Sequence, residues 1–199
     1  DDKGQVLGWS HTIVGQSILT GTPFEAFMVK NGVDGVMVEG VADTPYQLPL
    51  ALQIHHPKVN VPVLWWRSVG HTHTAFVMET LVDEIARSTG QDPVAYRRQL
   101  LGDKHKRHLA ALDLAVDRSG YGRKLPKGHA FGVAVHESFG SVVAYVVEAS
   151  VRDGQPVLHK VTAGVSCRVI SSGWRCAWCR ATPPTRRRPT RAAARCRSR

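Results

Sequence analysis

The chain has 199 residues, of which 43% are hydrophobic, and a formal net charge of +10. This length allows one domain or one and a half. The apolar fraction is ordinary for a globular protein, so a sizeable core can form. No apolar run approaches the length that crosses a bilayer, so we expect no membrane span.

The N-terminal part predicts short elements separated by glycine and proline. The chain opens with Asp1-Asp2-Lys3-Gly4, a turn-like sequence without an initiator methionine, so we expect the start to lie inside a longer protein. Thr22 and Pro23 are typical of a helix start. The expected elements are a strand within residues 5–15, a short helix over 23–29, and strands at Val36–Glu39 and Leu50–His55.

Residues 61–86 predict a strand, a tight turn and a helix. The apolar run from Val61 to Trp66 is rich in strand-forming residues, and Arg67-Ser68-Val69-Gly70 interrupts it. From His71 onward apolar residues recur at three- and four-residue steps, which predicts one buried helical face. Glu79 and Asp83 fall largely off that face.

The turn between strand and helix has the chemistry of an anion site. A helix that begins after Gly70 would aim its first N–H groups and its dipole at the loop. Arg67 adds a permanent cation whose forked donors suit oxyanions. Trp65 and Trp66 would exclude water, and Gly70 would allow a close approach of backbone or ligand. The alternative is that both tryptophans belong to the core and Arg67 pairs with a surface carboxylate.

The rest of the body predicts two further helices and three strands. Asp92 and Pro93 are typical of a helix start, and this helix should end at Gly102. Asp153-Gly154 predicts a hairpin turn. The expected elements are a helix over 104–118, strands over 130–136 and 141–151, and an antiparallel return over 157–165. Because Ser141–Val147 is nearly all apolar, its strand should be central in the sheet. The predicted fold class is α+β, with mixed or antiparallel sheet segments and three main helices.

The residues after Val165 differ sharply from the body. All sixteen acidic residues precede Ser166, whereas ten of the 26 basic residues follow Val165, so residues 1–165 carry sixteen of each sign. All four cysteines also lie after Val165: Cys167, Cys176, Cys179 and Cys196. Three interpretations compete. The residues could form a basic nucleic-acid-binding arm, or a zinc site from Cys167, Cys176 and Cys179 that lacks a fourth ligand at good spacing, or they could be a shifted reading frame never selected to fold.

Four segments resemble the large subunits of molybdenum hydroxylases, most closely the isoquinoline 1-oxidoreductase beta subunits. They are GTPFEAFMVKNGVD with VEGVADTPY; VPVLWWRSVGHTHTAFVMETLVDEIA with DPVAYRRQLL; KRHLAALDLA; and GVAVHESFGSVVAYVVEASV. They follow the family's order and span nearly all of residues 1–165. Where the family continues with roughly Val-Asp-Cys-Gly-x-x-Ile-Asn-Pro, this chain departs after Cys167. The resemblance therefore implies a partial molybdopterin-binding domain over 1–165 and a frameshifted, disordered tail over 166–199.

The resemblance implies cofactors and partners for the intact subunit. It would bind molybdenum through molybdopterin cytosine dinucleotide, and hydroxylate an aldehyde or N-heterocycle with oxygen from water. A separate small subunit with two [2Fe–2S] clusters would accept the electrons. The family's Gly-Val-Gly-Glu-type motif, which carries the glutamate base, and its Gly-Gln-Gly cofactor loop are both absent here. We therefore expect a fragment that is inactive alone, with no role for nucleic acid, and the sequence leaves the compartment open between cytoplasm and periplasm.

The resemblance carries site residues over at one place. Trp66, Arg67, Ser68, Val69 and Gly70 match the family's aromatic-Arg-x-x-Gly loop beside the pterin and substrate pocket. Arg67 would contact an oxyanion of cofactor or substrate, and Val69 would form a pocket wall.

Other polar residues have structural alternatives. Glu137 would be either a base or a satisfied polar group at a strand break. His71 and His73 would form either a metal pair or hydrogen bonds at the helix end. The His55-His56 and His105/His108 pairs are predicted to lie on the surface.

Overall fold

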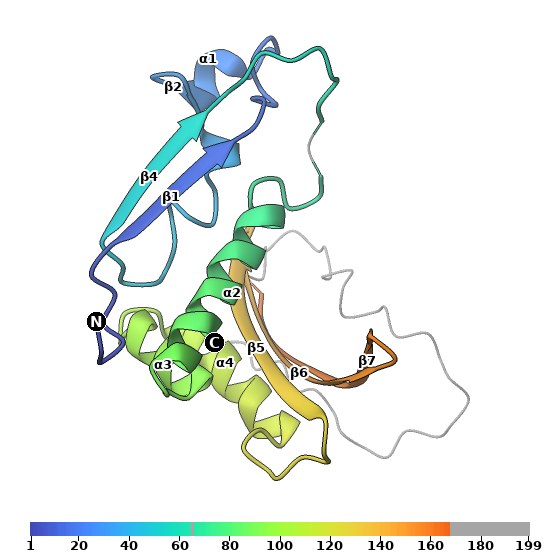
Figure 1. Ribbon diagram of the computed structural model, residues 1–199. Coiled ribbons are helices and arrows are strands. Elements are labelled where there is room, and N and C mark those ends of the chain that lie inside the picture. Colours follow the sequence, from blue (N-terminus) through green and yellow to red (C-terminus); the bar gives the residue numbers. More distant parts are fainter. Residues whose placement is uncertain (65, 168–199) are drawn as a thin grey trace. The chain divides into compact units, whose positions relative to one another are not determined.

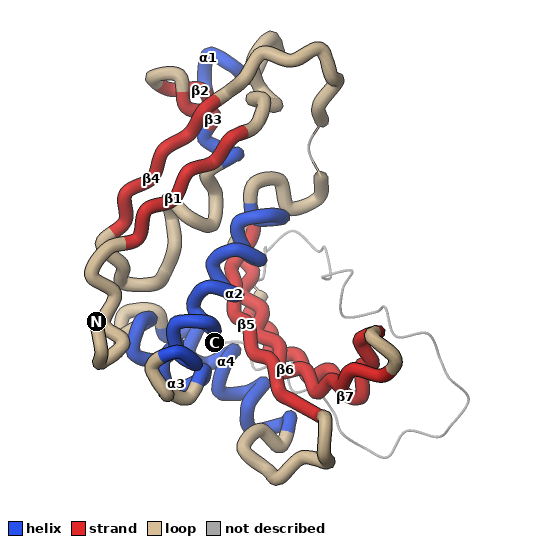
Figure 2. The backbone as a smooth tube through the Cα atoms, viewed as in Figure 1, coloured by secondary structure: helices blue, strands red, loops and turns tan. Residues whose placement is uncertain are grey.

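A three-stranded antiparallel sheet forms the centre of the C-terminal half of the described chain. In this computed structural model, which describes residues 1–64 and 66–167, the strands are β5 (His129–Ser138), β6 (Ser141–Arg152) and β7 (Gln155–Ser166), in the order β5-β6-β7. Figure 2 shows them side by side. The prediction that the apolar strand is central is confirmed, and Asp153 and Gly154 form the predicted turn with φ of 51° and 73°.

Three longer helices connect the N-terminal part to this sheet. They are α2 (His71–Ser88), α3 (Pro93–Leu101) and α4 (Lys106–Ser119), as predicted. Asp92 caps α3, because its carboxylate accepts hydrogen bonds from the Val94 and Ala95 amides at 3.0 and 2.8 Å. The helix α4 lies against one face of the sheet (Figure 1), where a Cβ on Gly164 would come within 2.1 Å of the Ala111 carbonyl oxygen.

The core lies between these helices and the sheet. Alternate residues of β6 point toward α4, and α4 buries the apolar side chains on that face of β6. Among the most buried side chains are Met78 and Val82 of α2, Leu101 of α3, Leu112 of α4, Val135 of β5 and Val142 of β6. The mixture of helices and small sheets is α+β, as predicted.

The N-terminal part contains short elements around a parallel strand pair. β1 (Trp9–Val14) pairs with β4 (Leu50–His55) in parallel, from Trp9↔Leu50 to Val14↔His55. Between them lie α1 (Glu25–Met28), the two-residue strands β2 (Val29–Lys30) and β3 (Val33–Asp34), and the 3₁₀ helix η1 (Gly35–Met37). The short helix and the Leu50–His55 strand are confirmed.

Two strand predictions are wrong. Val36–Glu39 is not a strand: η1 begins there because the buried carboxylate of Asp34 accepts the Val36 amide at 3.1 Å, and also binds the Ile18 and Leu19 amides. The described residues of 61–66 form no strand either. Leu64 and Trp66 are 77% and 75% exposed, and without a partner strand an apolar run has no ladder to join.

The described residues up to Cys167 belong to one compact unit, Asp1–Cys167. Residues 168–199 of the arginine-rich tail lie outside the described part of the chain. The three interpretations of this tail therefore stay predictions. Among the described residues, no helix combines the length and apolar character needed to cross a bilayer.

Candidate functional site

The predicted anion site is a tight turn that leads directly into α2. The Val69 amide donates to the Trp66 carbonyl at 3.1 Å, and α2 begins at His71, as expected. Val69 has φ of 46°, a left-handed conformation that a β-branched residue rarely adopts. Such strain persists where surrounding contacts impose it, and it is concentrated at functional sites.

Gly70 meets the chain's own backbone. A Cβ at this position would lie 2.1 Å from the Val36 carbonyl oxygen and 3.2 Å from the Glu39 amide nitrogen. The sequence predicted that backbone or ligand would approach Gly70 closely. Residues 36–39 make this approach, and they therefore pack directly against the start of α2.

The amides at the start of α2 are largely engaged. The Thr72 amide donates to Val69 at 3.2 Å, and the His73 amide donates to Gly70 at 3.3 Å. The helix terminus therefore offers fewer free donors than the sequence suggested, and anion binding at this turn depends mainly on Arg67.

Arg67 and Trp66 are both exposed, and Ser68 and Val69 are half-buried. Arg67 forms no hydrogen bond or ion pair with the part of the chain that the structure describes, so the alternative in which it pairs with a surface carboxylate has no support there. Trp65 lies outside the described residues, and the exposed Trp66 does not belong to the core. The turn thus presents a cation and an aromatic ring to solvent.

Substituting Gly70 with alanine is expected to lower the free energy of unfolding by about 1–3 kcal/mol, because the new Cβ overlaps backbone that must shift. Gly8→Ala is the matched control, since a Cβ at Gly8 would meet nothing within 4 Å. Urea denaturation of both variants measures the difference. Equal stability of the two variants would show that residues 36–39 do not approach Gly70 this closely.

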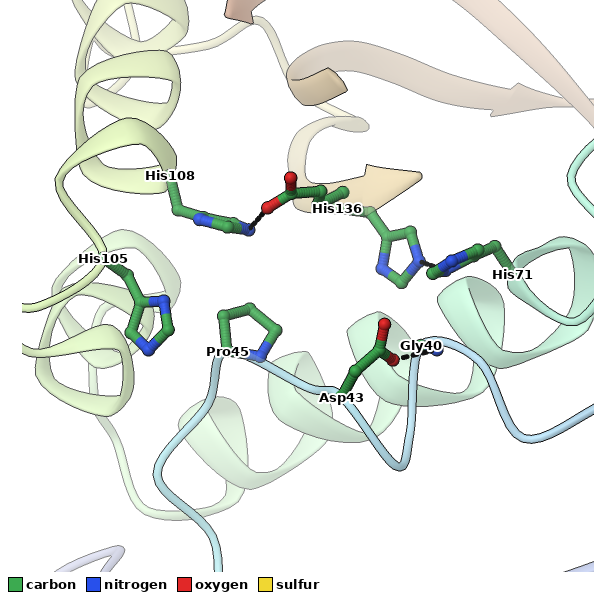
Figure 3. Close-up of a pocket in the computed structure, with 8 residues that line it drawn as sticks. Gly40, Asp43, Pro45, His71, His105, His108 and His136 are labelled. Carbon is green, nitrogen blue, oxygen red and sulfur yellow. Dashed lines mark hydrogen bonds and ion pairs between the residues drawn. The ribbon is translucent and has the colours of Figure 1, made fainter. Parts of the chain in front are cut away.

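A second candidate site is a small pocket rich in histidine, shown in Figure 3. It has a volume of about 100 Å³. The loop between η1 and β4, the start of α2, the start of α4 and the end of β5 contribute its lining. These residues are Gly40, Asp43, Pro45, His71, His105, His108, His136 and Glu137.

On one side of the pocket, His71 and His136 join α2 to β5. Their Nδ1 and Nε2 atoms are 2.9 Å apart, and the rings meet edge to face with centroids 5.0 Å apart. Gly40 makes room for this pair, because a Cβ on it would lie 3.0 Å from His71 Nδ1 and 2.3 Å from Thr74 Oγ1. Burial, and secondarily the nearby His71, lowers the pKa of His136 to about 4.

On the other side, Glu137 is bound by α4. Arg107 Nη1 donates to its Oε1 at 3.2 Å, and His108 Nε2 lies 3.4 Å from its Oε2 without an aligned hydrogen bond. Burial lowers the pKa of His108. Glu137 is therefore ion-paired, which agrees with its interpretation as a satisfied polar residue rather than a free base.

Of the His105/His108 and His55-His56 pairs, predicted to lie on the surface, only His55 is fully exposed; His105 and His56 are half-buried and His108 is buried. His108 is only 5% exposed. His56 is half-buried, where its Nε2 accepts the Asp34 amide at 3.2 Å and its Nδ1 lies 2.9 Å from the Gly15 carbonyl oxygen. Nothing in the local sequence distinguishes these histidines from exposed ones, since their burial comes from residues distant in the chain.

The metal alternatives have no geometric support in residues 1–64 and 66–167. No group of three or more His, Cys, Asp or Glu side chains there is placed to hold a metal ion. His71 bonds to His136 rather than forming a pair with His73, so its role is hydrogen bonding at the helix end. Cys176 and Cys179 of the proposed zinc site lie outside the described residues.

Comparison with known proteins leaves the family resemblance as an expectation. Neither the models of protein families nor the curated proteins include a significant match to this chain.

Proposed function

We propose that the chain is part of the large subunit of a molybdenum hydroxylase, and that its Trp66–Gly70 turn contributes to the site for molybdopterin cytosine dinucleotide. The observation that carries this proposal is the exposed Arg67 guanidinium, without an ion-pair partner among the described residues, on a strained turn at the start of α2. The resemblance of the four segments supplies the identity of the cofactor.

The residues of the turn suit an anionic, planar ligand. Arg67 can donate two parallel hydrogen bonds to an oxyanion, and Trp66 offers an aromatic face for stacking. The dipole of α2 adds a favourable potential at the same place. In the large subunit the metal is held by the pterin sulfurs, so the proposal requires no cluster of protein ligands from this chain.

Within the proposal, the cofactor supplies the molybdenum centre that hydroxylates an electron-poor carbon of an aldehyde or N-heterocycle, with electrons passing to a small [2Fe–2S] subunit. The role of this chain is to bind and orient. Arg67 holds an oxyanion of cofactor or substrate, and Val69 limits the space beside it. Glu137 is engaged by Arg107 and the family's glutamate-bearing motif is absent from this chain, so we expect the chain alone to be inactive.

Binding of a fluorescent anionic pterin tests this role. Pterin-6-carboxylate should bind the full chain saturably. Arg67→Gln should raise the Kd for this ligand about tenfold. That change is a loss of about 1.4 kcal/mol of binding free energy, which is typical of a hydrogen bond to a charged group. Fluorescence anisotropy measures both affinities.

Arg152→Gln is the matched control, because Arg152 is also exposed but lies at the end of β6. It should leave the affinity unchanged. Equal affinities of the wild type and Arg67→Gln, or the absence of saturable binding, would contradict the proposed role of the turn.

A further inference from the structure

The hydrogen bond between His71 and His136 ties the first residue of α2 to β5. It is the imidazole contact nearest the Trp66–Gly70 turn, since His71 follows Gly70 directly. Both rings line the pocket in Figure 3. His71 is only 9% exposed, so water does not readily replace its partner.

We propose that the His71–His136 pair is a proton-operated latch. It holds the first turn of α2, and the adjoining turn of residues 66–70, against β5 while at least one of the two rings is neutral. It opens when both rings are protonated. The consequence for ligand binding rests on the proposed function, whereas the latch itself does not.

The chemistry of two imidazoles determines when the bond exists. A neutral ring has one donor and one acceptor nitrogen, while a protonated ring has two donors. A neutral–neutral or a neutral–protonated pair can therefore form an N–H···N bond. A doubly protonated pair has no acceptor, and it places two positive rings with centroids 5.0 Å apart in a partly buried site.

Two carboxylates from the loop after η1 face the His71–His136 pair. They do not fully compensate the positive charge that a second proton would bring to the two rings. Glu39 Oε2 lies 4.0 Å from His71 Nε2, and Asp43 lines the pocket. Burial raises the pKa of Glu39, although the nearby His71 partly opposes this. Burial therefore favours the neutral form of Glu39, which weakens its ability to balance a second proton on the pair.

The remaining ionisable groups come from α4 and β5. His105 and His108 line the pocket from the start of α4, and a proton on either ring would bring a further positive charge close to the pair. Glu137 of β5 is already paired with Arg107. The surroundings therefore favour one proton on the pair over two.

Opening should be confined to the start of α2. Farther along this helix, Glu79 is bound by Arg97 and by the Val135 amide of β5 at 2.8 Å, so that part stays fixed. Near the start of α2, Thr74 Oγ1 is a further side-chain tie, because it donates to the Glu39 carbonyl at 2.7 Å. Loss of the ring contact therefore loosens residues 66–74 without releasing the whole helix.

Amide hydrogen exchange of the full chain tests the latch. The amides of residues 75–77 bond to the carbonyls of residues 71–73 in the first turn of α2. Their protection factors, corrected for the intrinsic effect of pH, should therefore fall at least tenfold more than those of α3 between pH 7 and pH 4. Amides of α3 provide the baseline for global unfolding and should fall less. An equal fall in both helices would overturn the proposal.

Two variants make the test specific. His136→Gln cannot take up a proton but can still hydrogen bond to His71, so the local loss of protection should disappear. His55→Gln, at an exposed histidine of β4, should behave like the wild type. Persistence of the local loss in His136→Gln would contradict the latch.

A measurement on the unmodified chain covers the case in which His136→Gln does not fold. The ring resonances of His71 and His136, followed by NMR, should titrate in two separated steps, with the second step coinciding with the local opening. A single step, or independent titration of the rings, would refute the latch. Because neither readout involves a ligand, failure of the pterin experiment leaves this result interpretable by itself.

Discussion

Replacing Arg97 with leucine is expected to lower the free energy of unfolding by about 3–5 kcal/mol, since it leaves buried charge without its partner. The Arg97 side chain is 0% exposed. Its Nε donates to Glu79 Oε2 at 2.9 Å, and its Nη1 donates to Asp83 Oδ1 at 2.6 Å. Glu79 also accepts the Tyr46 hydroxyl at 2.6 Å and the Val135 amide, so one network joins α2, α3, β5 and the loop before β4.

Its neighbour Arg98 provides the control. Arg98 pairs with Asp113 at 2.8 Å, but both side chains are nearly half exposed, so Arg98→Leu should cost no more than about 1 kcal/mol. Urea denaturation at pH 7 compares the two variants. Similar losses would mean that the Arg97 network is not the main polar contact holding these elements together.

Acidification from pH 7 to pH 4 is expected to remove up to about 3 kcal/mol of stability through His136. Burial, and then His71, lowers the pKa of His136 from 6.5 to about 4 in the folded chain. Between these two values the unfolded state binds more protons than the folded state. The contribution is therefore complete above about pH 6.5 and is lost as the pH falls toward 4.

Urea denaturation curves at half-unit pH steps measure how steeply the free energy of unfolding changes with pH, which is the slope that His136 should set. His136→Gln should flatten it between pH 6.5 and pH 4, whereas His55→Gln should leave it unchanged because His55 is exposed. An unchanged slope in His136→Gln would show that His136 does not stay neutral in the folded chain.

Elements with strong local signals could be predicted from the sequence. The cap at Asp92-Pro93, the turn at Asp153-Gly154 and the apolar period of α2 each depend on residues within a few positions of one another. The central position of β6 was predictable because a strand buried by neighbours has a continuous apolar sequence.

Features that depend on distant partners were not predictable. Glu79 was assigned to the polar side of its helix, but it is 7% exposed because Arg97 and Tyr46 meet it there. Residues 61–66 have strand composition, yet the described chain provides no strand beside them. Helical period and strand propensity contain no information about such partners.

The candidate sites show the same division. The Arg67-Ser68-Val69-Gly70 turn could be identified locally, and α2 begins where expected. The histidine pocket could not, since His71 and His136 are 65 positions apart. The sequence contained the residues, but only the fold brings them to one pocket.

The nucleotide sequence across codons 160–175 tests the central claim most directly. If residues 1–165 come from a molybdenum hydroxylase subunit, we predict that another reading frame will restore the family's continuation, including its Asn-Pro step, in place of Arg168 and the arginine-rich residues that follow. If no frame encodes that continuation, the proposed relationship is contradicted.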